Sequence, residues 1–169
     1  MLQLRITHCT WHDLDAVYKL AEALAHYFPK PEAATTGIYE LLVNAIEHGT
    51  LGLGFETKTQ LLRSGRWYEE IRARLHAPET SGKSILVSLE RSENACELRI
   101  TDEGSGFAWQ EFSEHKQSPE RPNGRGLWIA FHSSFDEVVF NATGNEVTCR
   151  AHSSSTASAI QSTPLRARA

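Results

Sequence analysis

Residues 36–49 have the sequence Thr36-Gly-Ile-Tyr-Glu-Leu-Leu-Val-Asn-Ala-Ile-Glu-His-Gly49, and their polarity repeats with the 3.6-residue period of an α-helix. Apolar side chains at helical spacing predict one buried face, made of Ile38, Leu41, Leu42, Ala45 and Ile46. A second face holds carboxylates, an amide and an imidazole without any Lys or Arg, namely Glu40, Asn44, Glu47 and His48. We expect Gly49 to end the helix as a left-handed cap. The polar face suits a metal ion and a proton acceptor, and the alternative for this stretch alone is an ordinary amphipathic helix.

The composition predicts one globular domain. The chain has 169 residues, which is enough for one buried core and too few for two ordinary domains. Its formal net charge of -4 gives no general attraction to nucleic acid or to an anionic membrane, so we expect neither as a partner. The 3 cysteines are far apart and lack CxxC spacing, which predicts neither a disulfide framework nor a zinc site. Because no signal-like or membrane-spanning apolar segment is present in the sequence, we expect a cytoplasmic protein.

The remaining segments predict a mixture of strands and helices. Alternating apolar residues predict an edge or second strand followed by two hairpins, at residues 2–7, 84–90, 95–101, 136–141 and 146–150. Helical spacing predicts a helix over residues 13–28, stopped by Pro29 and Pro31, and two short helices in residues 55–75 on either side of Gly65. We interpret Trp67 and Tyr68 as packing residues rather than as a ligand platform. Ser, Thr and Ala dominate residues 152–169, which predicts a disordered tail.

A second motif, Asp102-Glu-Gly-Ser-Gly-Phe107, follows a predicted strand. A carboxylate at this position, next to Gly104 and Gly106, places a hydrogen-bond acceptor beside a backbone that a ligand can approach closely. Asp102 would therefore suit an exocyclic amino group. Because Asp and Gly are common in turns, a simple hairpin exit is the alternative for this motif alone.

A third motif, Gly124-Arg-Gly126, precedes the apolar stretch Leu127-Trp-Ile-Ala-Phe131. We expect a helix to begin directly after the glycines, so that its unpaired N–H groups and positive dipole end face a phosphate. The same tripeptide is common in loops. The preceding residues 113–123 are polar and almost free of apolar side chains, which predicts a mobile loop over a site.

Taken in order, the three motifs resemble those of the GHKL ATPase superfamily, which shares the Bergerat ATP-binding fold. They are Glu40-x-x-x-Asn44-Ala45 on a helix, Asp102-x-Gly-x-Gly after a strand, and Gly124-x-Gly126-Leu127 opening a helix. The first and third look most like the anti-sigma-factor serine/threonine kinase branch (RsbW/SpoIIAB-like), and residues 55–75 look like the insertion in the version attached to response-regulator phosphatases. The resemblance implies an α+β fold for residues 1–151, a two-layer sandwich with a mixed, largely antiparallel sheet and helices on one face.

The resemblance also implies the ligands ATP and Mg²⁺ and a role for each motif. Asn44 would bind Mg²⁺, Glu40 would be the general base, and Asp102 would accept a hydrogen bond from the adenine amino group. Other positions would shape the pocket or contact the nucleotide, namely Gly104, Gly106, Gly124, Gly126, Leu127, Thr148 beside Asp102, and Arg121 or Arg125 on the γ-phosphate. These roles fit the chemistry, because Mg²⁺ favours oxygen ligands and keeps several waters, and because a base one turn from the metal ligand can take a serine proton. Pro122 departs from the flexible lid of the family.

The function that the resemblance implies is phosphorylation of a serine or threonine on a STAS-type anti-sigma-factor antagonist. Two alternatives stay open: a module that uses nucleotide only to shape a surface for a sigma factor, and a histidine-kinase-like ATPase domain. Glu40 favours the kinase, because a pure binding module needs no base. We expect the histidine kinase less, because no phospho-accepting helical hairpin precedes the domain in this sequence. A homodimer is also left open.

Overall fold

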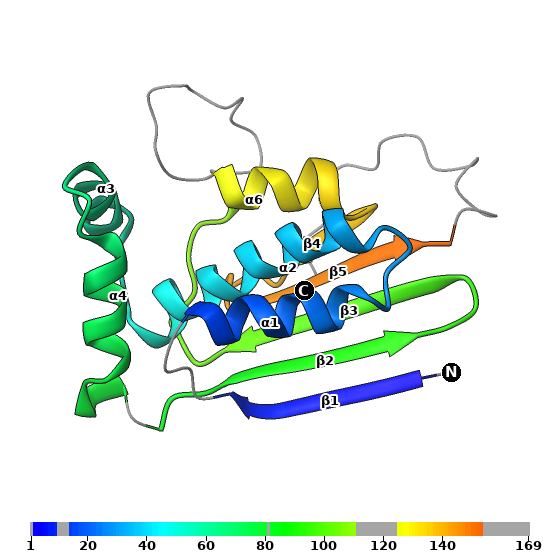
Figure 1. Cartoon of the computed structure of the whole chain (residues 1–169), viewed down its shortest axis with the longest axis horizontal. Helices are drawn as coiled ribbons and strands as arrows, with labels where there is room; N and C mark the ends of the chain where they lie inside the picture. Colours follow the sequence, from blue (N-terminus) through cyan, green and yellow to red (C-terminus); the bar gives the residue numbers. More distant parts are fainter. Residues whose placement is uncertain (1, 10–13, 81, 111–124, 154–169) are drawn as a thin grey trace.

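A computed structural model describes residues 2–9, 14–80, 82–110 and 125–153 of the chain. Their strands form one sheet in the order β1-β2-β3-β5-β4 (Figure 1). The strands are β1 Leu2–Cys9, β2 Ile85–Arg91, β3 Ala95–Asp102, β4 Glu137–Phe140 and β5 Glu146–His152. The predicted α+β sandwich is confirmed. Every strand pair in the described residues is antiparallel. The prediction of a largely antiparallel sheet therefore holds, but the mixed character that was expected is not found in these residues.

Two hairpins account for the antiparallel order. β2 and β3 are joined by a short turn, and so are β4 and β5, as the sequence predicts. β5 also pairs with β3, which places β4 at one edge, while β1 pairs with β2 and forms the other edge. The predicted loop at residues 113–123 lies outside the described residues, and so does most of the predicted tail at residues 152–169. His152 is the last residue of β5 and does not belong to a tail.

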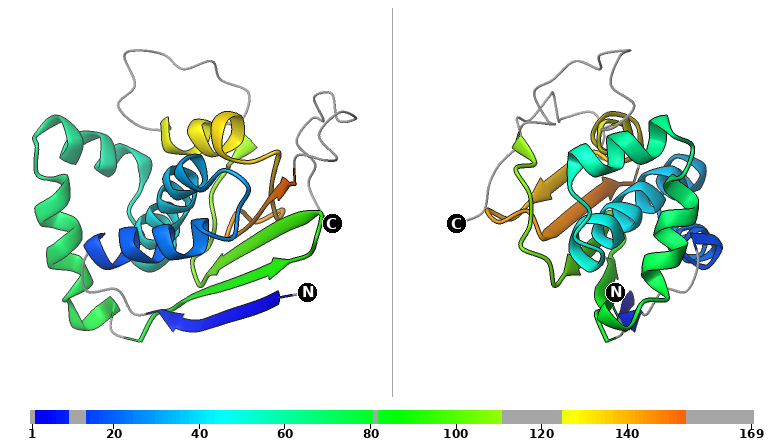
Figure 2. Two further views of the ribbon diagram at one scale, coloured as in Figure 1. Left: turned by 45° about the vertical axis from the view of Figure 1, so that its right-hand side comes forward. Right: turned by 90° about the vertical axis from the view of Figure 1, so that its left-hand side faces the viewer.

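Helices cover one face of this sheet (Figure 1; Figure 2). α1 packs against α2, and α2 also contacts α6 and the helical turn that follows α6. The elements of this layer are α1 Leu14–Ala25, α2 Pro31–Asn44, η1 Ala45–Thr50, α6 Arg125–Ile129 and η3 Ala130–Ser134. Beyond one end of the sheet lie α3 Phe55–Arg63 and α4 Trp67–Leu75, followed by the short turn η2 Pro78–Thr80 (Figure 1). No helix in the described part of the chain is long and apolar enough to span a membrane.

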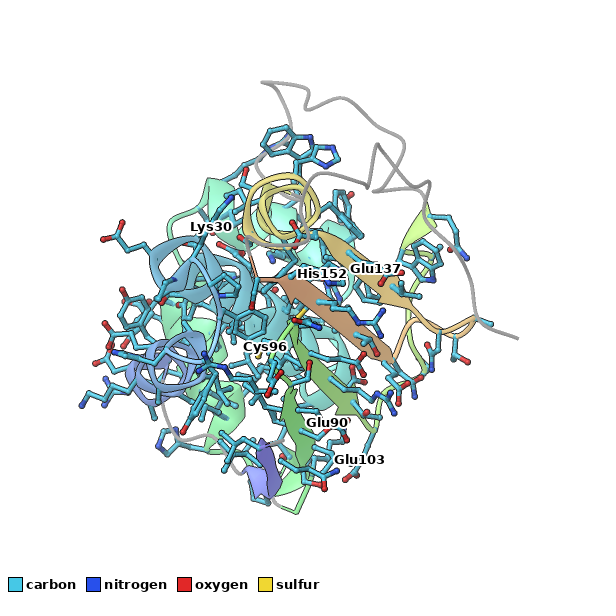
Figure 3. The ribbon with its side chains drawn as sticks, turned by 90° about the vertical axis from the view of Figure 1, so that its right-hand side faces the viewer. Lys30, Glu90, Cys96, Glu103, Glu137 and His152 are labelled. Carbon is cyan, nitrogen blue, oxygen red and sulfur yellow. The ribbon has the colours of Figure 1, made fainter. Side chains whose placement is uncertain are left out.

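Alternation along the strands separates the core from an outer face. On β3, Cys96, Leu98 and Ile100 are buried beneath the helices, while the alternate residues Glu97 and Arg99 are partly exposed. Figure 3 looks along the layers and shows Cys96 on the helical side of the sheet. The outer face carries cross-strand ion pairs, in which Arg150 of β5 contacts Glu97 of β3 and Glu137 of β4. Most residues that β2, β3 and β5 present on this face are polar, in contrast to the buried helical side.

The helix that carries Glu40 and Asn44 begins earlier than predicted. It starts at Pro31, which the sequence analysis treats only as a stop for the preceding helix. Proline is well suited to the first helical turn, because the N–H that it lacks would have no intrahelical partner there. Pro31 therefore begins α2 rather than only following α1.

The prediction that Gly49 is a left-handed cap is wrong. The helix continues past Asn44 as the π-helical segment η1, in which the N–H of Leu51 donates to the carbonyl of Ile46 at 2.8 Å. The positive φ occurs later, at Gly52, with a value of 59°. Gly49 is instead a position of close packing, because a Cβ there would lie 2.3 Å from Cγ of Asp102. The wider π turn brings the backbone of the helix against the end of β3.

The division of residues 55–75 into two helices is confirmed. Gly65 lies between α3 and α4 with a φ of 69°, which favours glycine. Trp67 packs against the core, as interpreted from the sequence. The same interpretation is wrong for Tyr68, which is 48% exposed.

Candidate functional site

A pocket lies between the α2–η1 helical segment and the adjoining ends of β3 and β5. Its polar lining comes from three separate parts of the chain and consists of Asn44, His48, Asp102, Asn145 and Glu146. Apolar side chains form the rest of the wall, chiefly Leu41, Ile100, Phe107, Phe140 and Val147. A few polar groups in an apolar wall suit a flat heterocyclic ligand that is held by a small number of hydrogen bonds.

Asp102 lies at the end of β3 in contact with two glycines. One of its carboxylate oxygens, Oδ1, accepts a hydrogen bond from the N–H of Gly104 at 2.8 Å. The backbones of Gly49 and Gly104 are also in contact, since a Cβ on Gly104 would lie 2.6 Å from Cα of Gly49. Burial raises the pKa of Asp102 to about 6, although the Gly104 hydrogen bond opposes the shift. The first and second sequence motifs therefore meet at this carboxylate.

The loop after Asp102 is held by the turn between β4 and β5. Gly106 has a φ of 78°, and a Cβ there would lie 1.9 Å from the carbonyl oxygen of Thr143, so only glycine fits. Asn145 donates from Nδ2 to the carbonyl oxygens of Asp102 and Gly104, at 3.4 Å in each case. This asparagine lies in the turn between the two strands of the second predicted hairpin. Asn145 lies close to the second motif because β5 pairs with β3, and no local sequence pattern predicts that pairing.

His48 forms one wall of the pocket. Its Nδ1 donates to the carbonyl of Leu53 at 2.7 Å, and its ring stacks on Phe107 with centroids 5.5 Å apart. Burial lowers the pKa of His48, and nearby Glu47 opposes this shift. The imidazole is therefore fixed on two sides next to Asp102. Asn44, one turn earlier, lines the same pocket.

Glu40 lies outside the pocket lining and beside the start of α6. A Cβ on Gly126 would lie 1.9 Å from Oε2 of Glu40, so the carboxylate occupies the space that a side chain at position 126 would need. Burial raises the pKa of Glu40, while Lys58 acts in the opposite direction. This contact joins the first motif to the third. A ligand that extends from Asp102 past Asn44 would reach Glu40 and α6 at its far end.

Glu47 has a different environment from the other polar residues of its helix. It is fully buried, and its two carboxylate oxygens accept hydrogen bonds from Lys58 of α3 and from Nε1 of Trp67 of α4, each at 2.5 Å. The cation absent from the local sequence thus comes from the following helix. The predicted polar face is divided, with Asn44 and His48 on the pocket and Glu47 on the α3–α4 pair.

Thr148 lies on the opposite face of β5 from the pocket. Val147 lines the pocket, and successive strand side chains alternate, so Thr148 points to the outer face, beside its register partners Arg99 and Val139. This placement contradicts the prediction that Thr148 supports Asp102. Asn145 holds the Asp102 backbone instead.

The third motif is described only in part. Arg121 and Gly124 lie outside the described residues, and Arg125 begins α6 with a side chain that also lies outside them. The prediction that both glycines precede the helix is therefore wrong for Gly126, which lies in the first turn of α6. Leu127 is buried in the core at 4% exposure.

The donor set fits a magnesium ion that is held mainly by a phosphate ligand. No group of three His, Cys, Asp or Glu side chains in the described residues could hold a metal by itself. The Asn44 amide in the pocket offers one oxygen donor, and Mg²⁺ is commonly bound through one or two protein groups together with substrate phosphates and waters. Asn44 is the described residue that would hold the ion.

Comparison with known families covers the second half of this site. Residues 72–151 match the family model described as the histidine kinase-like ATPase domain. The match includes Asp102 and α6 but begins after Glu40 and Asn44, whose placement rests on the geometry above. No curated protein matches the chain. Together with the α+β sandwich, the match supports an ATP-binding ATPase domain of the GHKL type.

Proposed function

We propose that this chain is an ATP-dependent serine/threonine protein kinase of the anti-sigma-factor type, with a STAS-type antagonist protein as its substrate. The observation that carries the proposal is the convergence of three distant motifs. Gly49 contacts Asp102 at one end of the α2–η1 segment, and Glu40 contacts Gly126 toward the other. One elongated ligand along this segment would meet all three motifs.

Asp102 gives this arrangement its preference for adenine. Its carboxylate is half-buried and has one oxygen engaged by Gly104, which leaves the other as an acceptor for an exocyclic amino group. The apolar walls, including Ile100 and Phe140, would cover the faces of the base. A keto group at the same place would put two acceptors against each other, so guanine should bind less tightly.

The triphosphate would run from Asn44 toward Glu40. Magnesium, when bound, neutralises phosphate charge. Glu40 would take the proton of an incoming serine hydroxyl while that oxygen forms its bond to the γ-phosphorus and the bond to the ADP oxygen breaks. Burial raises the pKa of Glu40, which makes its carboxylate a stronger proton acceptor. Protein groups in such transfers mainly position the reactants and stabilise charge.

Incubation of the purified chain with γ-labelled ATP and a panel of STAS-type antagonists tests the proposal directly. Label on a serine or threonine of one antagonist, absent with Glu40→Ala, is the expected result. Label on histidine would favour the histidine-kinase-like alternative. Nucleotide-dependent binding of a sigma factor without label on any antagonist would favour the binding module.

A further inference from the structure

The buried carboxylate of Glu47 connects the nucleotide pocket to the α3–α4 pair. Glu47 belongs to η1, where it directly precedes the pocket residue His48 and follows Asn44 by three positions. Both of its oxygens are engaged from outside that helix, by Lys58 of α3 and by Trp67 of α4. The carboxylate of Glu47, on the helical segment that lines the pocket, thus accepts both of these hydrogen bonds from α3 and α4.

The backbone after Glu47 depends on the same contact region. The N–H of Leu53 donates to the carbonyl of Glu47 at 2.6 Å, and the carbonyl of Leu53 accepts from His48 at 2.7 Å. Lys83 donates to the carbonyl of Thr50 at 2.7 Å. The end of η1 is therefore held by side chains and by the chain segment that leads into α3.

The π-helical form of η1 makes this support consequential. π-helical turns are rare and occur mostly as single turns within α-helices, frequently at functional sites. Here the π turn places Gly49 against Asp102 and His48 against Phe107. Return of the segment to α-helical geometry would rotate Gly49 and His48 relative to β3 and would alter the wall of the pocket.

We propose that Glu47 is a positioning residue, and that its pairing with Lys58 and Trp67 lets the α3–α4 pair set the nucleotide affinity of the pocket. The inference rests on the proposed binding of ATP. It assigns α3 and α4 a regulatory role: a change that moves them away from η1 weakens nucleotide binding, although neither helix lines the pocket. The communication runs through one carboxylate that cannot remain buried without its partners.

Calorimetric titration with Mg-ADP tests this role in variants that leave Glu47 itself intact. Lys58→Met removes the cation, and Trp67→Phe removes the N–H while keeping an aromatic ring. Each should weaken ADP binding by roughly tenfold, within the usual range of coupling between sites. Lys58→Arg keeps the charge and should restore most of the affinity. The matched control is Glu70→Gln, which breaks the ion pair with Arg74 within α4 and leaves Glu47, Lys58 and Trp67 unchanged.

Two further readouts distinguish positioning from general stabilisation. Thermal unfolding gives the folded fraction, so that affinity is compared per folded molecule. Hydrogen exchange of the amides of Gly49 to Leu51 should accelerate in Lys58→Met while the amides of β3 remain protected. Unchanged affinity per folded molecule in both Lys58→Met and Trp67→Phe would overturn the inference while leaving nucleotide binding intact. Absence of ADP binding by the wild-type chain would overturn both.

Discussion

Carboxylates on the two sides of the sheet have opposite environments. On the outer face, Glu97 lies in a network in which Arg150 contacts it and also contacts Glu137. On the helical side, burial raises the pKa of the pocket residue Asp102 to about 6 and also raises that of Glu40, which lies outside the pocket lining. The outer carboxylates are matched with guanidinium groups, whereas Asp102 and Glu40 are held where ionisation is unfavourable.

This difference indicates which carboxylates serve stability and which serve a ligand. Hydrogen bonding to Glu97 raises the pKa of Arg150, so the folded state favours the charged form of this guanidinium. Burial without such compensation makes a carboxylate a stronger hydrogen-bond or proton acceptor, at the expense of folding stability. Substitutions on the two faces should therefore have opposite signatures: loss of function with little loss of stability at the pocket, and the reverse outside it.

Glu40 should give the largest functional effect. In Glu40→Ala, phosphate transfer should fall by about 10²–10⁴-fold, the usual contribution of a positioned base, while ATP and partner binding persist. Single-turnover phosphorylation and a pull-down on the same protein measure the two quantities. Intact transfer in this variant would contradict the proposed role, and a parallel decline in binding would indicate a structural one.

Asn44 should control the metal dependence of binding. Asn44→Ala should weaken Mg-ATP binding by about tenfold or more and leave metal-free ATP binding nearly unchanged, because only the complex with Mg²⁺ uses the amide oxygen. Titrations with magnesium and with EDTA give the comparison. Equal losses under both conditions would make Asn44 a structural residue.

Asp102 should show a conflict between affinity and stability. Asp102→Asn places a donor opposite the adenine amino group and should cost roughly 1–3 kcal/mol of ATP binding. The folded pKa of about 6 exceeds the ordinary value of 3.8, so the folded chain binds this proton more tightly, and the contribution of Asp102 to stability declines as the pH rises through that interval. The variant without nucleotide should therefore unfold at a higher temperature than wild type above pH 7. A lower melting temperature there would contradict the assigned environment.

The outer face should give the smallest functional effects. Arg150→Met removes one of the two arginine partners of Glu97 and should lower the free energy of unfolding by about 1 kcal/mol, a typical value for a partly exposed pair, without changing ATP affinity. Thr148→Val on the same face should change neither quantity appreciably. Weaker ATP binding in Thr148→Val would restore the original assignment of Thr148 to the site.

Periodicity was sufficient to predict most of the fold. The two hairpins, the edge strand and the division at Gly65 depend on local alternation and turn residues, which the sequence carries directly. The π turn could not be predicted in this way. It accompanies a close contact between Gly49 and Asp102, two residues that are distant in sequence, and a glycine at a helix end otherwise predicts a cap.

The structure brings some of the predicted site residues together and places another on the opposite face of the sheet. Asp102 and Asn44 line a common pocket, as expected from their motifs. The prediction for Thr148 is wrong, because the face of β5 that meets the pocket depends on its register with β3. The partner of Glu47 also comes from a separate helix, and no pattern around residue 47 indicates Lys58.

The central claim is that ATP occupies the pocket beside Asp102, and a matched glycine pair tests it most directly. A Cβ at Gly49 would lie 2.4 Å from Oδ1 of Asp102, whereas nothing lies within 4 Å of a Cβ at Gly54. Calorimetry with Mg-ATP should therefore give wild-type affinity for Gly54→Ala and a loss of about tenfold or more for folded Gly49→Ala, because the Asp102 carboxylate must move. Equal, undiminished affinity in both variants would contradict the account.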